Sequence, residues 1–221
     1  MTSSDMNYLT VALPKGKLFD YSARMLAELG YTAEGLSEKS RKLVIVNETK
    51  KIKFIITKTA DLPTYVEYGA ADIGIIGKDV LLEEEKNVYE LLDLQFGYCR
   101  LMVAVPQALQ QDSFSDYAHM RVATKFPKIA ERFFRSKGIQ MEIIKLNGSI
   151  ELAPMVGLAE MIVDIVETGR TLKENQLIEV AQIAPATARL IANRVSFKMK
   201  FDRIHQLTEE LKNLLGRGEE R

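Results

Sequence analysis

A short run of threonine, glycine and arginine residues directly follows an apolar segment, and these residue types together suit the binding of a phosphate monoester. The run consists of Thr168, Gly169, Arg170 and Thr171. Gly169 lets the backbone approach an anion closely, the threonines supply hydroxyl donors, and Arg170 supplies a charged fork. A helix that begins here adds its first N–H groups and its dipole. The segment therefore predicts a phosphate-binding loop.

An acid near the end of the preceding apolar segment makes this prediction more specific. Asp164 lies near the carboxyl end of Met161–Val166, and one carboxylate can accept hydrogen bonds from both hydroxyls of a ribose. The alternative is structural: Thr168 or Thr171 caps a helix and Gly169 makes the turn. For Thr-Gly-x-Thr alone the two interpretations are evenly balanced, and Asp164 favours phosphoribosyl binding.

The elements that must position this loop are predicted from the pattern of apolar residues. Short runs rich in Val and Ile, bounded by Gly, Pro or charge, indicate strands. Strands are expected at Leu9–Leu13, Leu43–Val46, Phe54–Thr57, Ile73–Ile76, Leu101–Val105, Val122–Thr124, Met141–Leu146 and Met161–Val166. Helices are expected at Leu18–Leu29, Val80–Asn87, Ile129–Lys137, Leu172–Leu177, Arg189–Val195 and Met199–Leu215. This alternation predicts an α/β fold, with helices covering sheets that are apolar on both faces.

Composition and charge argue against several classes of protein. The 221 residues are 47% hydrophobic and carry 30 basic and 30 acidic side chains, so neither a broad basic face nor a nucleic-acid partner is expected. The single Cys99 excludes a disulfide scaffold, and the distant His119 and His205 suggest no metal motif. No apolar run approaches the ~20 residues of a bilayer span, and Met1–Asn7 lacks a signal-peptide pattern. We therefore expect no membrane association and a cytoplasmic location.

Several further segments, taken together with the loop, resemble one enzyme family. They are Val11–Leu18, Ala71–Val80, Phe96–Arg100, Ala123–Pro127 and Leu146–Glu160. From about residue 9 to about residue 197 the chain resembles the ATP phosphoribosyltransferases. It is most similar to their short form, the catalytic subunit without the C-terminal regulatory domain. The combination of segments is far more specific than any one of them.

A few positions depart from the family pattern. Lys17 and Lys58 stand where Arg is usual, so the positive charge is kept but a bidentate fork is lost at each place. Glu160 stands where Asp is common, which is a milder change. The more widespread phosphoribosyltransferases carry two adjacent acids before the loop, whereas here Val163 precedes Asp164. This difference argues against the nucleobase-salvage fold.

The resemblance also implies an architecture and a partner. It implies two lobes with mixed, mainly parallel sheets flanked by helices, similar to periplasmic binding proteins, with a cleft between the lobes. Residues 1–94 and 177–221 are expected to form the first lobe. Residues 95–176 are expected to form the second lobe and to carry the phosphoribosyl pyrophosphate loop. The short form works with a separate subunit that resembles histidyl-tRNA synthetase, so a hetero-oligomer is implied.

The reaction implied by the resemblance joins ATP to 5-phosphoribosyl-1-pyrophosphate, called the donor below. Its phosphoribosyl group moves to N1 of ATP, giving phosphoribosyl-ATP and pyrophosphate, the first step of histidine biosynthesis. Mg²⁺ is expected on pyrophosphate oxygens with several retained waters, so no protein metal ligands are assigned. The rivals are a non-catalytic two-lobe binding protein and a phosphoribosyltransferase with another acceptor, which the fold alone does not separate.

Roles are assigned to individual residues as hypotheses. Asp164, which holds the ribose hydroxyls, and Lys15 are the expected catalytic residues. The donor is expected to contact Glu167, Thr168, Gly169, Arg170 and Thr171. The nucleotide or pyrophosphate is expected near Gly16, Lys17, Lys58, Asp72, Gly77 and Glu151. For Glu151, a structural carboxylate at a helix start is an equal alternative.

Overall fold

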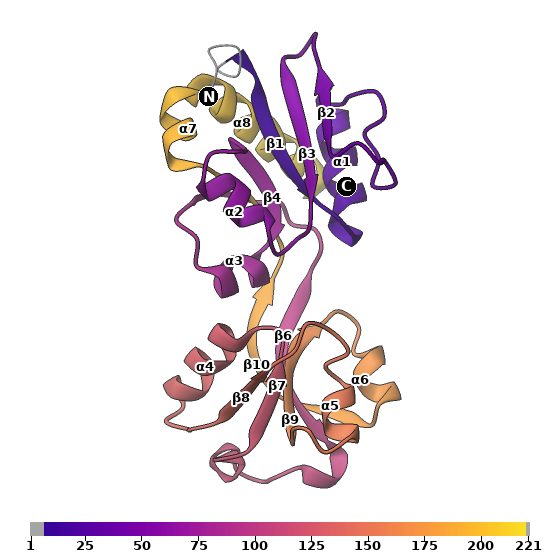
Figure 1. Cartoon of the computed structure of the whole chain (residues 1–221), viewed down its shortest axis with the longest axis vertical. Helices are drawn as coiled ribbons and strands as arrows, with labels where there is room; N and C mark the ends of the chain where they lie inside the picture. The colour runs from indigo at the N-terminus through magenta and orange to yellow at the C-terminus, as the bar shows by residue number, and fades with distance from the viewer. Residues whose placement is uncertain (1–6, 220–221) are drawn as a thin grey trace. The chain divides into compact units, whose positions relative to one another are not determined.

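The computed structural model describes residues 7–219, and side chains through residue 216, in two compact units that each contain one sheet (Figure 1). The first unit comprises the described residues up to Gly97 and those from Thr187 onward, and Tyr98–Ala186 form the second. The first change of unit thus lies close to the expected residue 95. Residues 1–6 and 220–221 of the expected first lobe, and most of the segment judged not to be a signal peptide, lie outside the described residues.

The second boundary lies ten residues later than the expected residue 177. Leu177–Ala186 form strand β10, which pairs antiparallel with β6 (Cys99–Pro106) from Leu177 opposite Pro106 to Ala186 opposite Cys99. These backbone hydrogen bonds place residues 177–186 in the second unit. The sequence alone gave no sign of this pairing, because its two register shifts interrupt the alternation of apolar and polar residues.

A six-stranded sheet forms the centre of the first unit, in the order β2-β3-β1-β4-β11-β5. Its strands are β1 (Leu9–Pro14), β2 (Val44–Asn47), β3 (Ile52–Thr57), β4 (Ile73–Gly77), β5 (Tyr89–Asp93) and β11 (Ala188–Ala192). β3, β1 and β4 pair in parallel, and the other pairings are antiparallel. These pairings give β1, β3, β4 and β5 one direction and β2 and β11 the other, so the sheet is mixed.

Helices cover both faces of this sheet, because successive residues of a strand point to opposite faces. The helices are α1 (Lys17–Glu28), α2 (Leu62–Glu67), α3 (Lys78–Glu84), α7 (Arg194–Met199) and α8 (Phe201–Glu219). Val11 and Leu13 of β1 belong to a core cluster with Leu26 of α1 and Ile204 of α8. Ala12, between them, belongs to a cluster with α2 and α3. One strand therefore holds both layers together.

The second unit contains a five-stranded sheet in the order β10-β6-β9-β7-β8. Its remaining strands are β7 (Arg121–Thr124), β8 (Glu142–Lys145) and β9 (Met161–Val166). Its helices are α4 (Pro127–Ser136), α5 (Leu152–Met155) and α6 (Arg170–Glu174), with 3-10 turns at Gln107–Leu109 and Phe114–Tyr117. β9, β7 and β8 pair in parallel, while β6 is antiparallel to both of its neighbours. Four of its five described strands therefore share one direction.

The alternation of residues along β9 places Asp164 on a definite face. Val163 packs in a cluster with Phe134 of α4. Ile162 and Val166 pack in another cluster, with α5 and α6, on the opposite face (Figure 1). Because Asp164 lies two residues from each of them, it shares the face of α5 and α6.

One expected helix is wrong, and the reason is local. Arg189–Val195 were expected to be helical, but Ala188–Ala192 form β11, and α7 begins only at Arg194. Four of the five residues of β11 are buried, and a short, mostly apolar run does not distinguish a buried strand from a buried helix. Similarly, α6 ends at Glu174, and Leu177 begins a strand.

No helix within residues 7–219 combines the length and the apolar character that crossing a bilayer requires.

Candidate functional site

The carboxyl ends of three parallel strands gather the predicted donor-binding residues at one edge of the second sheet. In the register, Thr124 of β7 pairs with Val163 of β9 and with Lys145 of β8. The loops that leave these strands therefore begin side by side. One of them is the Thr-Gly-Arg-Thr loop, and another leads to Glu151. Ligands of open α/β sheets bind at edges of this kind.

The loop enters α6 through a glycine in a left-handed conformation. Gly169 has φ 76° and ψ 0° and occupies the N-cap position, where no side chain caps the helix. A Cβ built on it would meet its nearest neighbour at 3.5 Å, an ordinary contact, so the backbone conformation rather than lack of space requires glycine. The hydroxyl of Thr168 accepts only a long hydrogen bond of 3.4 Å, from the Arg170 N–H. Of the structural alternative, the loop therefore shows the turn at Gly169 but no threonine that caps the helix.

The side chains of this loop lie at the surface. Glu167, Thr168, Arg170 and Thr171 are all exposed. Arg170 Nε donates to Glu174 at 2.9 Å, one turn along α6, but the two side chains are 83% and 62% exposed. Such a surface pair contributes little to stability, so an incoming anion can displace it. Because α6 has only five residues, its helix dipole is weak. Binding of a phosphate here therefore depends mainly on the first N–H groups of the helix and on the loop hydroxyls.

Asp164 is half-buried, and its surroundings change its acidity. Burial raises the pKa of Asp164 to about 6. A hydrogen bond of 2.8 Å from the Ile165 N–H lowers it, nearby Glu151 raises it, and Lys125 lowers it. These influences place Glu151 and Lys125 among the electrostatic neighbours of Asp164. A carboxylate held in this way is available to the hydroxyl groups of a ligand near neutral pH.

Glu151 immediately precedes α5 and has the helical conformation, with no side-chain bond to the helix start. The equal alternative, a carboxylate that caps the helix, is therefore not observed. Lys125 follows β7 directly. Its place near Asp164 does not follow from the sequence, because the strand register that brings β7 beside β9 is a tertiary feature.

A group of lysines lies at the carboxyl edge of the first sheet. Parallel pairing aligns Pro14 of β1 with Thr57 of β3, so Lys15 and Lys58 follow neighbouring strand ends. The Lys15 N–H donates to the Thr57 carbonyl at 2.9 Å, and Thr59 Oγ1 donates to the Lys15 carbonyl at 3.1 Å. The structure therefore brings Lys15 and Lys58 together, with Lys17 two residues further along the chain.

Gly16, between Lys15 and Lys17, has φ 94° and ψ −160°, a conformation that L-residues rarely adopt. Its N–H donates to a carboxylate oxygen of Glu38 at 2.7 Å. Glu38 was not identified from the sequence, and no local pattern marks it. The amide of Gly16 thus already binds an anionic oxygen in this structure, which is the property a phosphate site needs.

Gly77 and Asp72 lie at opposite ends of β4. Ala12 pairs with Gly74, and continuing this parallel register places Gly77 level with Lys15. A Cβ on Gly77 would lie 2.1 Å from Asp79 Oδ1, so glycine gives that carboxylate room.

Asp72, at the amino end, is a correction to the predicted site. Its Oδ2 accepts from the Thr10 N–H and from Lys200 Nζ, both at 2.7 Å, and its side chain is 2% exposed. Strand direction and this buried pair give Asp72 a structural role, at the edge opposite Lys15.

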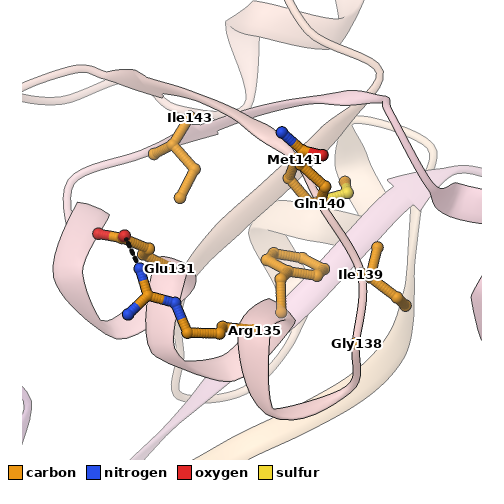
Figure 2. Close-up of a pocket in the computed structure, with 8 residues that line it drawn as sticks. Glu131, Arg135, Gly138, Ile139, Gln140, Met141 and Ile143 are labelled. Atoms are coloured by element: carbon orange, nitrogen blue, oxygen red, sulfur yellow. Dashed lines mark hydrogen bonds and ion pairs between the residues drawn. The ribbon is translucent and has the colours of Figure 1, made fainter.

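A hollow of about 410 Å³ in the second unit lies away from these residues (Figure 2). It is bounded by the second half of α4 and by the chain leading into the amino end of β8, opposite the edge that carries the phosphate loop. Arg135 and Glu131, two of its charged residues, pair at 2.5 Å. It contains none of the predicted site residues. Within the described part of the chain, no group of three His, Cys, Asp or Glu side chains is placed to hold a metal ion.

Comparisons with known proteins identify the family of the chain. The sequence profile of the HisG family, described as ATP phosphoribosyltransferase, matches residues 58–213. A protein of that name from Desulfitobacterium hafniense is 57% identical over 219 residues, which cover 96% of this chain and 98% of the relative. The ATP phosphoribosyl transferase (HisG:HisZ) complex from Thermotoga maritima includes a chain with TM-score 0.82 and 34% identity, covering 95% of this chain and 99% of that one.

The fold also resembles that of proteins with other roles. The substrate binding protein of an amino acid ABC transporter has TM-score 0.61 at 15% identity, covering 96% of this chain and 95% of that one. At that identity the likeness shows the fold alone, and it confirms the expected two-unit α/β architecture of mixed sheets. The high identity over nearly the whole length is what distinguishes the family: the chain belongs to the HisG family of ATP phosphoribosyltransferases, transferases of the first step of histidine biosynthesis.

Proposed function

We propose that this chain transfers the phosphoribosyl group of 5-phosphoribosyl-1-pyrophosphate to N1 of ATP, giving phosphoribosyl-ATP and pyrophosphate. The observation that carries this proposal is the juxtaposition of the half-buried Asp164 with the exposed loop 167–171 at the carboxyl edge of one sheet. Asp164 supplies a carboxylate for the ribose hydroxyls, and the loop for the 5-phosphate begins three residues later, so together they match these two parts of the donor.

In this proposal the donor is held through its 5-phosphate and its ribose. Glu167, Thr168, Gly169, Arg170 and Thr171 form the phosphate loop. Asp164 accepts hydrogen bonds from the ribose hydroxyls, with Glu151 beside it. As the bond between C1 and the pyrophosphate oxygen breaks, positive charge develops on the sugar ring, and the Asp164 carboxylate stabilises it.

The acceptor needs orientation more than activation. The N1 lone pair of adenine attacks C1, and N1 is largely unprotonated at neutral pH, so no general base is assigned. Negative charge moves to the departing pyrophosphate. Lys15, Lys17 and Lys58, with the Gly16 and Gly77 backbone at the same sheet edge, serve the pyrophosphate or the ATP phosphates. A cation about 4 Å from one phosphate charge contributes roughly 4 kcal/mol before desolvation at intermediate dielectric.

A divalent cation fits this donor set as a companion of the substrate. Asp164 and Glu151 are neighbouring carboxylates, and oxygen ligands of this kind suit Mg²⁺, which otherwise keeps its waters and binds phosphates. Mg²⁺ would be held by pyrophosphate oxygens and its own waters, with these two carboxylates nearby, and it would supply charge stabilisation for the leaving group. The closeness of Glu151 to Asp164 supports this assignment, because the negative charge of Glu151 is one of the influences that raise the pKa of Asp164.

We further propose that the chain acts with a separate subunit, as in the HisG:HisZ complex of Thermotoga maritima. Feedback by histidine would then act through the partner, a subunit resembling histidyl-tRNA synthetase. Because its substrates are metabolites of the cell interior, we place the enzyme in the cytoplasm.

The test is an assay of the purified chain with ATP, donor and Mg²⁺, with and without the HisZ-type subunit, in which phosphoribosyl-ATP is measured by chromatography. Product that requires both substrates supports the proposal. Pyrophosphate release only with a different acceptor would indicate another phosphoribosyltransferase. No product in either preparation, together with tight binding of an amino acid, would indicate a binding protein instead.

A further inference from the structure

A carboxylate lies against the backbone of the phosphate loop, where it opposes the binding of an anion. Glu179 of β10 places Oε1 3.5 Å from the position that a Cβ on Gly169 would take. Apart from the adjoining Thr168 and Arg170, the other described neighbour of that position is Val166 Cγ1, at 4.0 Å. A negative charge this close to the loop would repel a phosphate dianion. Its charge must therefore be balanced if the loop is to hold the donor.

Arg100 of β6 supplies that balance. Its Nη1 donates to Glu179 Oε2 at 2.8 Å and its Nη2 donates to Glu179 Oε1 at 2.9 Å, so the pair is bidentate. The two side chains are 27% and 30% exposed, which screens them less than a fully exposed pair. This planar, two-bond geometry is available to arginine and not to lysine.

The strand register fixes Arg100 on the face that carries the proposed site. Arg100 lies opposite Val166, and Met102 lies opposite Asp164, in the antiparallel pairing of β6 with β9. Alternate residues of a strand share a face, so Arg100 projects to the same side as Asp164. Its Nη1 also contacts Met102 Sδ at 3.7 Å on the way to Glu179.

We propose that Arg100 is a positioning residue for donor binding: by neutralising Glu179 beside Gly169, it keeps the phosphate loop able to accept a phosphate group. This inference rests on the proposed function, because it takes the loop as the 5-phosphate site. Arg100 acts through Glu179 and does not itself contact the substrate. Its loss therefore weakens donor binding only while the Glu179 carboxylate remains.

Removing the two charges singly and together tests this inference in the active enzyme with its HisZ-type subunit. Arg100→Gln is expected to raise the KM for the donor about tenfold, with a smaller change in kcat and an unchanged KM for ATP. Glu179→Gln is expected to leave the donor KM at or below the wild-type value. The double variant is expected to return it to within about threefold of wild type, because no unbalanced charge remains. The inhibition constant of inorganic phosphate, measured as a competitive inhibitor against the donor, should rank the variants in the same order as the donor KM.

Two controls separate the possible failures. Arg135→Gln removes an exposed arginine that pairs with Glu131 away from the loop, and should change neither KM. Thr171→Ala reports on the loop itself. If Thr171→Ala weakens donor binding and Arg100→Gln does not, this inference fails and the proposed function stands; if neither has an effect, the loop assignment fails.

A structural role for the pair predicts a different pattern. In that case the double variant would be as impaired as Arg100→Gln, and Glu179→Gln would raise the donor KM as well. Either result overturns the inference. If Arg100→Gln does not fold, the donor KM values of Glu179→Gln and of the double variant still test the inference. The inference requires both values to stay near or below that of the wild type.

Discussion

Asp164 shows at the scale of one residue how a functional group conflicts with packing. It lies on the face of β9 that packs against α5 and α6, and burial raises its pKa to about 6. The folded chain therefore holds this proton more tightly than the unfolded chain. The resulting destabilisation is absent below about pH 4, grows as the pH rises to about 6, and is complete at neutral pH. A shift of about two pKa units corresponds to roughly 3 kcal/mol as an upper value.

Replacing Asp164 with Asn should therefore stabilise the protein while it impairs the reaction. At pH 7 the free energy of unfolding is expected to rise by roughly 1–3 kcal/mol, because the amide carries no buried charge. Near pH 3 the difference should nearly vanish, since the carboxyl is then largely protonated in both states. Urea unfolding at the two pH values measures this. A variant that keeps full activity would remove Asp164 from the site.

The ionised form of Asp164 is the one that accepts hydrogen bonds from both ribose hydroxyls. We expect kcat/KM for the donor to fall below about pH 6 as Asp164 is protonated. The 5-phosphate of the donor titrates in the same range, so the wild-type profile alone is not sufficient. The profile of Asp164→Asn contains only the substrate contribution. An acid limb of equal steepness in both enzymes would contradict the assignment.

Thr171 contributes a hydroxyl group to the proposed phosphate loop. A hydrogen bond to a charged group contributes about 1.5–3 kcal/mol, so Thr171→Ala should raise the donor KM roughly tenfold or more. The KM for ATP should change little. Thr208→Ala, which removes a hydroxyl bonded to the Ile204 carbonyl within α8, is the matched control. Donor kinetics that match the wild type would refute the loop assignment.

At the scale of elements, a buried ion pair joins the segment between α7 and α8 to the amino edge of the first sheet. Lys200, between α7 and α8, donates from Nζ to Asp72 at 2.7 Å and to the Tyr8 carbonyl at 2.6 Å. The side chains of Lys200 and Asp72 are 8% and 2% exposed. Asp72 Oδ1 is buried with no hydrogen-bond partner in the described structure, so the pair is already incompletely satisfied. Removing one member leaves a buried charge unbalanced.

Lys200→Met should therefore lower the free energy of unfolding by about 3–5 kcal/mol. The exposed Lys198 provides the matched control, and Lys198→Met should have almost no effect. The donor KM of the folded Lys200→Met protein should equal that of wild type, because the pair lies at the edge opposite Lys15. Thermal unfolding and steady-state kinetics together measure both expectations. A stable Lys200→Met protein would show that the pair contributes nothing net.

At the scale of the whole molecule, the chain forms two units whose hydrophobic cores share no residues. Two core clusters draw only on residues of the first unit, and two others draw only on Tyr98–Ala186. The chain passes from one unit to the other between residues 97 and 98 and returns between residues 186 and 187. Because each unit has its own core, we expect each to have its own free energy of local unfolding.

Hydrogen exchange should resolve these two stabilities. Lys200→Met is expected to speed amide exchange in β1 and β4 and to leave β6 and β9 nearly unchanged. The donor is expected to slow exchange most strongly within 164–172, where it is proposed to bind. Mass spectrometry of peptides from both units measures the two effects in one experiment. Equal acceleration in both sheets would show that the units unfold as one.

The sequence by itself determined what is local. The phosphate loop and Asp164 lie within eight consecutive residues, so residue types and spacing were sufficient to suggest their chemistry. Several strands, β9 among them, were predicted close to their observed bounds, because a short run rich in Val and Ile that is bounded by Gly, Pro or charge is typical of a buried strand. Family resemblance then supplied the reaction, which periodicity alone does not contain.

Only the tertiary structure decided the relations between distant segments. Arg100 and Glu179 are 79 residues apart, and Gly16 and Glu38 are 22 apart, so no spacing rule connects them. Asp72 was predicted as a site residue, but the direction of β4 places it at the other edge of the sheet. The segment of β11 was predicted as a helix, but it pairs between β4 and β5. The physical reason is the same in each case. Strand order, direction and register follow from hydrogen bonds and packing between segments, and these contacts leave no fixed period in the sequence.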